Sequence, residues 1–205
     1  MRFISTALVF LSNMVMSYSQ DSTNLSLRVN GMHDDKLVLL SKLGGYDVID
    51  TIRLYSGAGS KHLLLDESNL YFLRIGDTGK VIYTHVFMQP NEDIAFEVDT
   101  AGSVSAIRGG DVAAAQFGFY SMARSPDFSQ IQPGDKEEKY IKIRDWLQQN
   151  RDSPFSAVVI YFYWSEFDVS QIKALVASLS EKAKEKNAAL RFLERELVKK
   201  ERASY

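Results

Sequence analysis

The feature that most constrains the fold is a change of hydrophobic period about halfway along the chain. Between Asn24 and Arg108, apolar residues alternate with polar ones in short runs separated by turn-forming residues. This pattern is typical of strands that bury one face. From Asp111 onward, apolar residues recur every three or four positions, as they do on the buried side of a helix. We therefore expect an α+β protein whose strands precede its helices.

About eight strands are predicted in the first half. The clearest is DIAFEVD, residues 93–99, because Ile94, Phe96 and Val98 fall on one face of an extended chain. The predicted strands lie at 24–30, 36–43, 46–54, 61–65, 69–76, 80–88, 93–99 and 102–107. Short strands at this spacing predict an antiparallel β-sandwich, or a partly closed barrel, over residues 20–108.

The second half, residues 109–205, is expected to form a small antiparallel helical bundle. Its helices are predicted at 112–124, at 136–149, after Pro154, after Asp168, and at about 185–202. Ser153 before Pro154 is typical of a helix start in which the serine side chain caps the first turn. The polar segment 125–135 is expected to be a loop.

The run FSAVVIYFYW, residues 155–164, is the most apolar part of the predicted bundle. It is about half as long as a membrane span and apolar on all sides, so a helix buried among other helices is favoured over a re-entrant membrane segment. Trp146, Phe155 and Trp164 are expected to fill the space between the helices.

The last two helices are predicted from their own signals. Asp168 and Gln171 have the spacing of a capping box at the start of one of them. The helix at about 185–202 has an apolar stripe made of Leu190, Leu193 and Leu197. Its charges, including the pair Glu196 and Lys200, are expected to form a solvated face.

The N-terminus, residues 1–19, has the pattern of a secretory signal peptide. Arg2 precedes an apolar run at 4–15, and Ser17–Ser19 has the small-x-small form of a cleavage site before Gln20. The alternative is an uncleaved N-terminal anchor, although the run is shorter than the ~20 residues of a membrane span. We predict a cleaved, periplasmic or secreted protein with no membrane span in its mature part.

The chain contains no cysteine. In an exported protein this excludes disulfide bonds, thiolate metal sites and thiol redox steps. It also removes the residue that a bacterial lipoprotein needs at its processed N-terminus. The net charge is only −2 and basic residues are not clustered with aromatics, which argues against nucleic-acid binding.

Candidate catalytic or ligating residues are few. His33, His62 and His85 lie on three different predicted elements, and only an arrangement in space would bring them together as a metal site. The stretch MHDD, residues 32–35, is interpreted as a turn. SGAGSKH, residues 56–62, lacks the spacing of a phosphate-binding loop and is interpreted as a flexible connection. We therefore predict no catalytic, cofactor-binding or metal-binding residue.

One exposed sheet face is considered as a ligand surface. Tyr71, Tyr83 and His85 are aromatic residues on neighbouring predicted strands. They either form such a surface or are ordinary cross-strand pairs, and the second interpretation is favoured.

The order of these segments resembles one protein family. LSLRVNG, KLVLLSKLGGYDVIDTIRL, NLYFLRIG and IYTHVFMQPNEDIAFEVD are similar, in this order, to the N-terminal domain of unknown function in exported thioredoxin-like proteins of Bacteroidetes, of the TlpA/ResA/AhpC-TSA type. The segment from NRDSPFS to about Lys200 resembles the helical linker of the same proteins. The similarity covers roughly Asn24 to Lys200.

The resemblance implies a role near envelope thiol-disulfide chemistry, but the Cys-x-x-Cys domain that follows the linker in the family is missing from this sequence. We therefore expect a non-catalytic exported binding or structural module of the bacterial cell envelope. The alternative is an accessory or truncated member of a thiol-disulfide oxidoreductase system that acts with a separate thioredoxin-like protein. A third hypothesis is an enzyme whose site is assembled from dispersed carboxylates and histidines.

Overall fold

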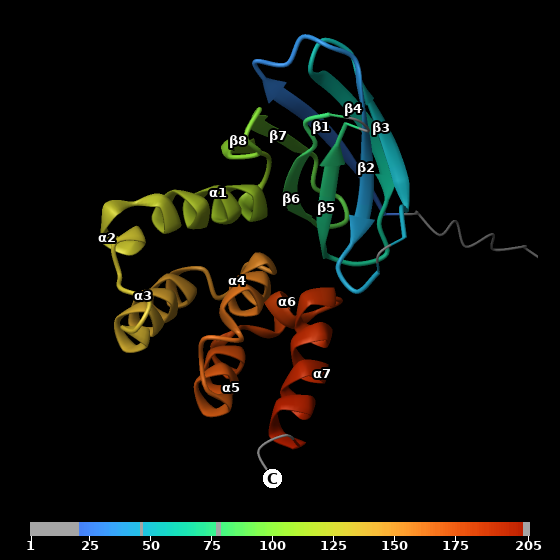
Figure 1. The fold of residues 1–205 in the computed structure, drawn as a ribbon. Coiled ribbons are helices and arrows are strands. Elements are labelled where there is room, and N and C mark those ends of the chain that lie inside the picture. The colour runs from blue at the N-terminus through green and yellow to red at the C-terminus, as the bar shows by residue number, and fades with distance from the viewer. Residues whose placement is uncertain (1–20, 46, 77–78, 203–205) are drawn as a thin grey trace, which may run out of the picture.

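The fold is seen in a computed structural model that describes residues 21–45, 47–76 and 79–202. The expected signal peptide at 1–19 lies outside the described residues. The described chain is α+β, and its eight strands precede its helices, as the change of period predicts (Figure 1).

The strands form two four-stranded sheets that face each other. In chain order they are β1 (Ser22–Asn30), β2 (Lys36–Lys42), β3 (Asp50–Leu54), β4 (Ala58–Leu64), β5 (Asn69–Ile75), β6 (Ile82–Met88), β7 (Ile94–Asp99) and β8 (Val104–Arg108). The first sheet has the order β4-β1-β7-β8 and the second the order β3-β2-β5-β6. The arrangement is sandwich-like and is not a closed barrel.

Alternating residues of each strand fill the space between the sheets. On β1, Leu25, Leu27 and Val29 are buried while the residues between them are exposed. This alternation is the one that the sequence pattern predicts for half-buried strands. The pairing of β1 with β7 is parallel, however, and all other pairs are antiparallel. The expectation of a purely antiparallel sandwich is therefore wrong at one pair of strands.

The connection between β3 and β4 is a tight turn, which corrects the interpretation of 56–62 as a flexible segment. Ser56 and Gly57 both have positive φ angles, and Tyr55 pairs with Ala58 across them. Positive φ at both central residues is typical of a two-residue hairpin turn. A Cβ atom at Gly57 would lie 2.6 Å from the carbonyl oxygen of Met32, so glycine is required for space as well.

The helices gather at one end of the sandwich (Figure 1). They are α1 (Asp111–Arg124), α2 (Pro126–Ser129), α3 (Lys136–Gln149), α4 (Phe155–Tyr163), α5 (Val169–Ser178), α6 (Glu181–Lys184) and α7 (Ala188–Arg202). The one-turn helix α2 falls inside the expected loop, where Pro126 stands at its first position. None of the described helices has both the length and the apolar character that crossing a bilayer requires.

Helix α4 is the buried helix that the apolar run predicts. Phe155 to Ile160 are fully covered, and Phe155 packs edge-on against Phe87 of β6 at 5.8 Å. Two details differ from expectation. Ser153 does not cap the helix, and its buried hydroxyl has no hydrogen-bond partner among the described residues. Trp164 is only half-buried, because it lies past the end of α4 beneath the ammonium group of Lys200.

Side-chain caps fix the starts of two later helices. The predicted capping box is confirmed, since the Asp168 carboxylate accepts from Gln171 N at 2.8 Å and Gln171 Oε1 accepts from Asp168 N. Buried Asn187 separates α6 from α7 and accepts from the backbone N–H of Ala189 and of Leu190. The last helix therefore begins at Ala188, three residues later than expected.

The sheets and the helices share one continuous hydrophobic core. Helix α1 joins them along β6, which is the last strand of its sheet. The side-chain amide of Gln116, oriented to satisfy its surroundings, donates to Phe87 O at 3.3 Å and accepts from Phe87 N at 3.0 Å. This pair of bonds replaces a neighbouring strand at that point of the edge.

Candidate functional site

The outer face of the β3-β2-β5-β6 sheet carries an unusual set of side chains. The register of β5 and β6 places Phe72 opposite His85 and Arg74 opposite Tyr83. The register of β2 and β5 places Leu39 opposite Arg74. Directly paired residues of neighbouring strands point to the same face, so these five side chains form one surface.

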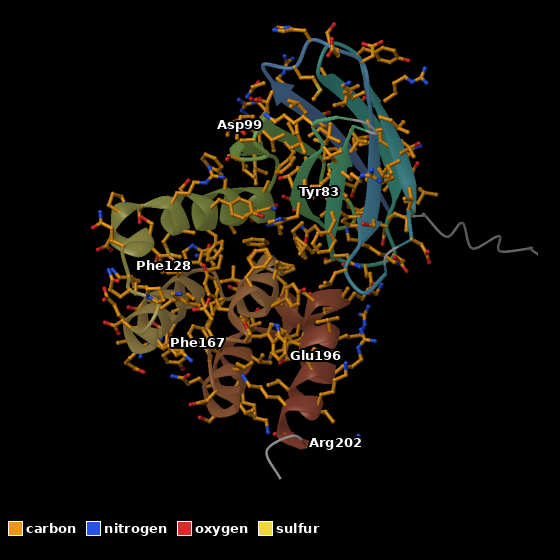
Figure 2. All side chains as sticks on the ribbon, in the orientation of Figure 1. Tyr83, Asp99, Phe128, Phe167, Glu196 and Arg202 are labelled. Carbon is orange, nitrogen blue, oxygen red and sulfur yellow. The ribbon has the colours of Figure 1, made fainter. Side chains whose placement is uncertain are left out.

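Exposure increases along this surface, away from the helices. Phe87 on β6 is fully buried beneath α4, Phe72 on the next row is 38% exposed, and Tyr83 beyond it is 69% exposed. In Figure 2, Tyr83 lies on the strands of the sheet above the helices. The helices therefore cover only part of this sheet face. The boundary between its covered and its exposed part is apolar, and we call this boundary the step.

His85 lies at this step, enclosed by aromatic rings. The centre of its imidazole lies 5.1 Å from that of Phe162, 5.7 Å from that of Tyr120 and 6.5 Å from that of Phe72. Its Nε2 atom is buried and has no hydrogen-bond partner among the described residues. Burial lowers the pKa of His85 from 6.5 to about 4, so the ring is neutral at pH 7.

A groove of about 540 Å³ runs along the step. Its floor is the sheet face, and its helical wall consists of Tyr161 on α4 and Phe192 on α7, whose rings meet edge-on at 5.3 Å. The loop after β2 closes one side with Leu43 and Val48. We call this cavity the sheet–helix groove. Its volume and its largely apolar lining lie in the range of small-molecule sites in proteins.

The charge in and around the groove is mainly positive. Arg74 is the one charged side chain among the described residues of its lining. A second cavity of about 620 Å³ shares the loop at 43–45 with the groove. Its charged lining residues are Lys42, Glu67, Arg191, Glu194 and Arg195, and Glu67 forms an ion pair with Arg191.

The hypothesis that Tyr71, Tyr83 and His85 share an exposed face is wrong for Tyr71. In the observed register Tyr71 pairs with Val86, so it points between the two sheets and is 3% exposed. Burial, with smaller contributions from Asp66 and Glu67, raises the pKa of its hydroxyl. Tyr83 and His85 do share a face, where they also form the expected cross-strand pairs.

The three histidines lie in separate places. His33 is in the connection between β1 and β2, within the predicted turn at 32–35. His62 on β4 contacts its cross-strand partner Asn24 on β1, in the sheet that does not contain His85. Within the described ranges, no three His, Asp or Glu side chains are close enough together to hold a metal ion.

The lowered carboxylate pKa values have structural causes. Hydrogen bonds from the backbone and side chain of Asn24 lower the pKa of Asp93. Backbone N–H groups of a turn do the same for Asp99, and the N–H of Gln171 does so for Asp168. The carboxylate of Asp93 ties it to strand β1, that of Asp99 stabilises its turn and that of Asp168 caps the start of α5, and we assign them no chemical role.

The sequence contained a usable signal for part of the groove. Residue parity places Phe72 with Arg74 on one face of the predicted strand at 69–76, and Tyr83 with His85 on one face of the predicted strand at 80–88, and the register of the two strands then brings the pairs together. No local pattern indicates that Tyr161 and Phe192 meet above them, because that contact depends on how α4 and α7 pack.

The chain matches no protein-family model, and no curated protein matches it significantly.

Proposed function

We propose that this protein is a non-catalytic binding module, exported to the bacterial cell envelope, that binds apolar ligands in the sheet–helix groove. The observation that carries this proposal is the incomplete cover of the sheet. Large aromatic side chains remain open to solvent where Tyr83 and Phe72 meet Tyr161 and Phe192. A contiguous apolar surface of this kind is typical of an interaction site.

The walls of the groove are held by packed elements. Phe72 is part of a central strand that has hydrogen-bonded neighbours on both sides. Tyr161 follows the fully buried part of α4, and Phe192 lies next to buried Leu193 on α7. We infer that α4, α5 and α7 form the small antiparallel bundle that the sequence predicts, and that this bundle fixes the helical wall. A preformed wall lowers the entropy cost of binding.

Export and family membership are further parts of the proposal. They are supported by the signal-peptide pattern at 1–19 and by the order of motifs that resembles the thioredoxin-linked envelope proteins. The chain has no cysteine, so any thiol-disulfide exchange in which it takes part needs the sulfur of another protein. N-terminal sequencing of the protein from a periplasmic fraction tests export, with Gln20 as the expected first residue.

A neutral fluorescent probe tests the binding function. N-phenyl-1-naphthylamine becomes fluorescent in apolar sites, and we expect the native protein to enhance its emission saturably. The double substitution Tyr83→Ser and Val48→Ser removes two exposed apolar groups of the groove and is expected to weaken probe binding about fivefold.

The matched control is the pair Tyr55→Ser and Leu64→Ser. These side chains are similarly exposed, at 60% and 59%, but they do not line the groove. The control protein is expected to bind the probe like the native one. Equal losses in both variants, or no saturable binding by the native protein, would contradict a binding function in the groove.

A further inference from the structure

We propose that the ligand of the sheet–helix groove is a single-chain anionic amphiphile, a long-chain carboxylate, whose chain lies on the aromatic floor and whose head group pairs with Arg74. This inference rests on the proposed binding function and adds the chemical class of the ligand. It follows from the position of the groove on the sheet, from its lining and from its charge.

The groove lies on the face of a sheet, and this position argues against an extended peptide. The two strands that form most of its floor, β2 and β5, have hydrogen-bonded neighbours on both sides, while β6, which borders the groove, is an edge strand. The backbone groups of β2 and β5 are therefore used within the sheet, whereas peptides that bind by adding a strand need a free edge. A ligand with a peptide backbone would bury amides that find few partners here.

The lining also argues against a ligand that is polar along its whole length. The side chains at the groove are mostly aliphatic and aromatic, including Leu39, Phe72, Tyr161 and Phe192. Hydroxyl groups spread over a sugar would lose water without gaining hydrogen bonds. An alkyl chain has no such cost and gains from the apolar area that it covers.

Arg74 is the one charged side chain among the described residues that line the sheet–helix groove. Its guanidinium group has no ion pair or hydrogen bond with any of the residues that the structure describes. It lies in the same cross-strand row as Leu39 and Tyr83, so it borders the apolar floor directly. A carboxylate at the end of an alkyl chain matches this arrangement, because guanidinium groups bind carboxylates with two parallel hydrogen bonds.

The neighbouring cavity strengthens the preference for an anion. Beyond the loop at 43–45 its lining adds Lys42, Arg191 and Arg195, against two glutamates. Together with Arg74, the charged residues that line the two cavities are four basic and two acidic ones, whereas the whole chain has a net charge of −2. A local positive patch on an acidic protein favours anionic ligands in both rate and affinity of binding.

Competition against the neutral probe tests the ligand class. Decanoate and decanol have the same alkyl chain and differ in charge, and both are used below the concentrations at which they aggregate. We expect decanoate to displace N-phenyl-1-naphthylamine with about fivefold higher affinity than decanol, and this ratio to fall as salt is added.

Arg74→Gln is expected to abolish the difference between decanoate and decanol, once each competitor's affinity is corrected for the affinity of the variant for the probe. Arg28→Gln is the matched control, since Arg28 is an exposed strand arginine on the other sheet. It is expected to keep the preference for decanoate. Thermal unfolding of both variants confirms that they are folded.

The outcomes separate the two proposals. If the probe binds but decanoate and decanol compete equally, the inference about the ligand class is overturned and the binding function stands. The ligand class is also overturned if Arg28→Gln removes the preference for decanoate as fully as Arg74→Gln does. If the probe itself does not bind saturably, both proposals fail.

Discussion

Acid is expected to destabilise this protein through His85, well before its carboxylates are protonated. The imidazole is buried among Phe72, Tyr120 and Phe162, and burial lowers its pKa to about 4 in the folded chain from 6.5 when it is exposed. As the pH falls below 6.5, the unfolded chain takes up a proton that the folded chain does not. The free energy of unfolding therefore decreases as the pH falls from about 6.5 towards 4.

The size of the effect follows from the two pKa values. The linkage relation gives a loss of about 2 kcal/mol between pH 7 and pH 5, and about 3 kcal/mol by pH 4. This is a large part of the stability of a typical domain. Urea unfolding at pH 7 and at pH 5, followed by the fluorescence of Trp146 and Trp164, measures it directly.

Substitution separates His85 from all other titrating groups. His85→Phe keeps an aromatic ring in the same cage but cannot be protonated, so its free energy of unfolding is expected to change little between pH 7 and pH 5. His62→Gln is the control, because His62 is exposed on the other sheet, and it should retain the loss of the native protein. An equal loss in His85→Phe and the native protein would refute this reasoning.

Three further predictions concern single contacts, each measured by chemical denaturation. Gly57→Ala is expected to lower the free energy of unfolding by about 3 kcal/mol, because a Cβ would clash with two carbonyl oxygens. Gly79 has a similar φ angle but open space around it, so Gly79→Ala should lower that free energy by only about 1 kcal/mol. Asp168→Ala removes the capping box of α5 and should cost about 1 kcal/mol. Gln116→Leu leaves the buried N–H and C=O of Phe87 unpaired, so we expect a loss of about 2 kcal/mol and faster hydrogen exchange at that amide.

The sequence predicted the elements better than their arrangement. Strands and helices were located because their periodicity is local, and the capping box at Asp168 is a signal four residues long. The parallel pairing of β1 with β7 was not predictable in this way, since it joins segments far apart in the chain. Ser153 has a typical cap sequence, yet its hydroxyl has no hydrogen-bond partner in the described part of the chain. There the tertiary packing of α4 outweighs the local preference.

The candidate site shows the same limit. Alternation places Phe72 with Arg74 and Tyr83 with His85, but the register of β5 against β6 decides whether the two pairs share a face. Alternation also does not show that this face is left partly uncovered. That property depends on how α4 and α7 pack against the sheet. Tyr71 illustrates this dependence on register, because it lies one position before Phe72 and therefore points to the opposite, inner face.

The place of β1 in its sheet has a consequence for the order in which the protein folds. Its neighbours are β4 and β7, and the partner of Asn30 is Asp99, so this first strand gains its second hydrogen-bonded neighbour only after Asp99 has left the ribosome. Pairings between such distant segments form slowly. The sheet β4-β1-β7-β8 is therefore completed late, whereas the β2-β3 and β5-β6 pairs of the other sheet join neighbouring segments and can form while the chain is still growing.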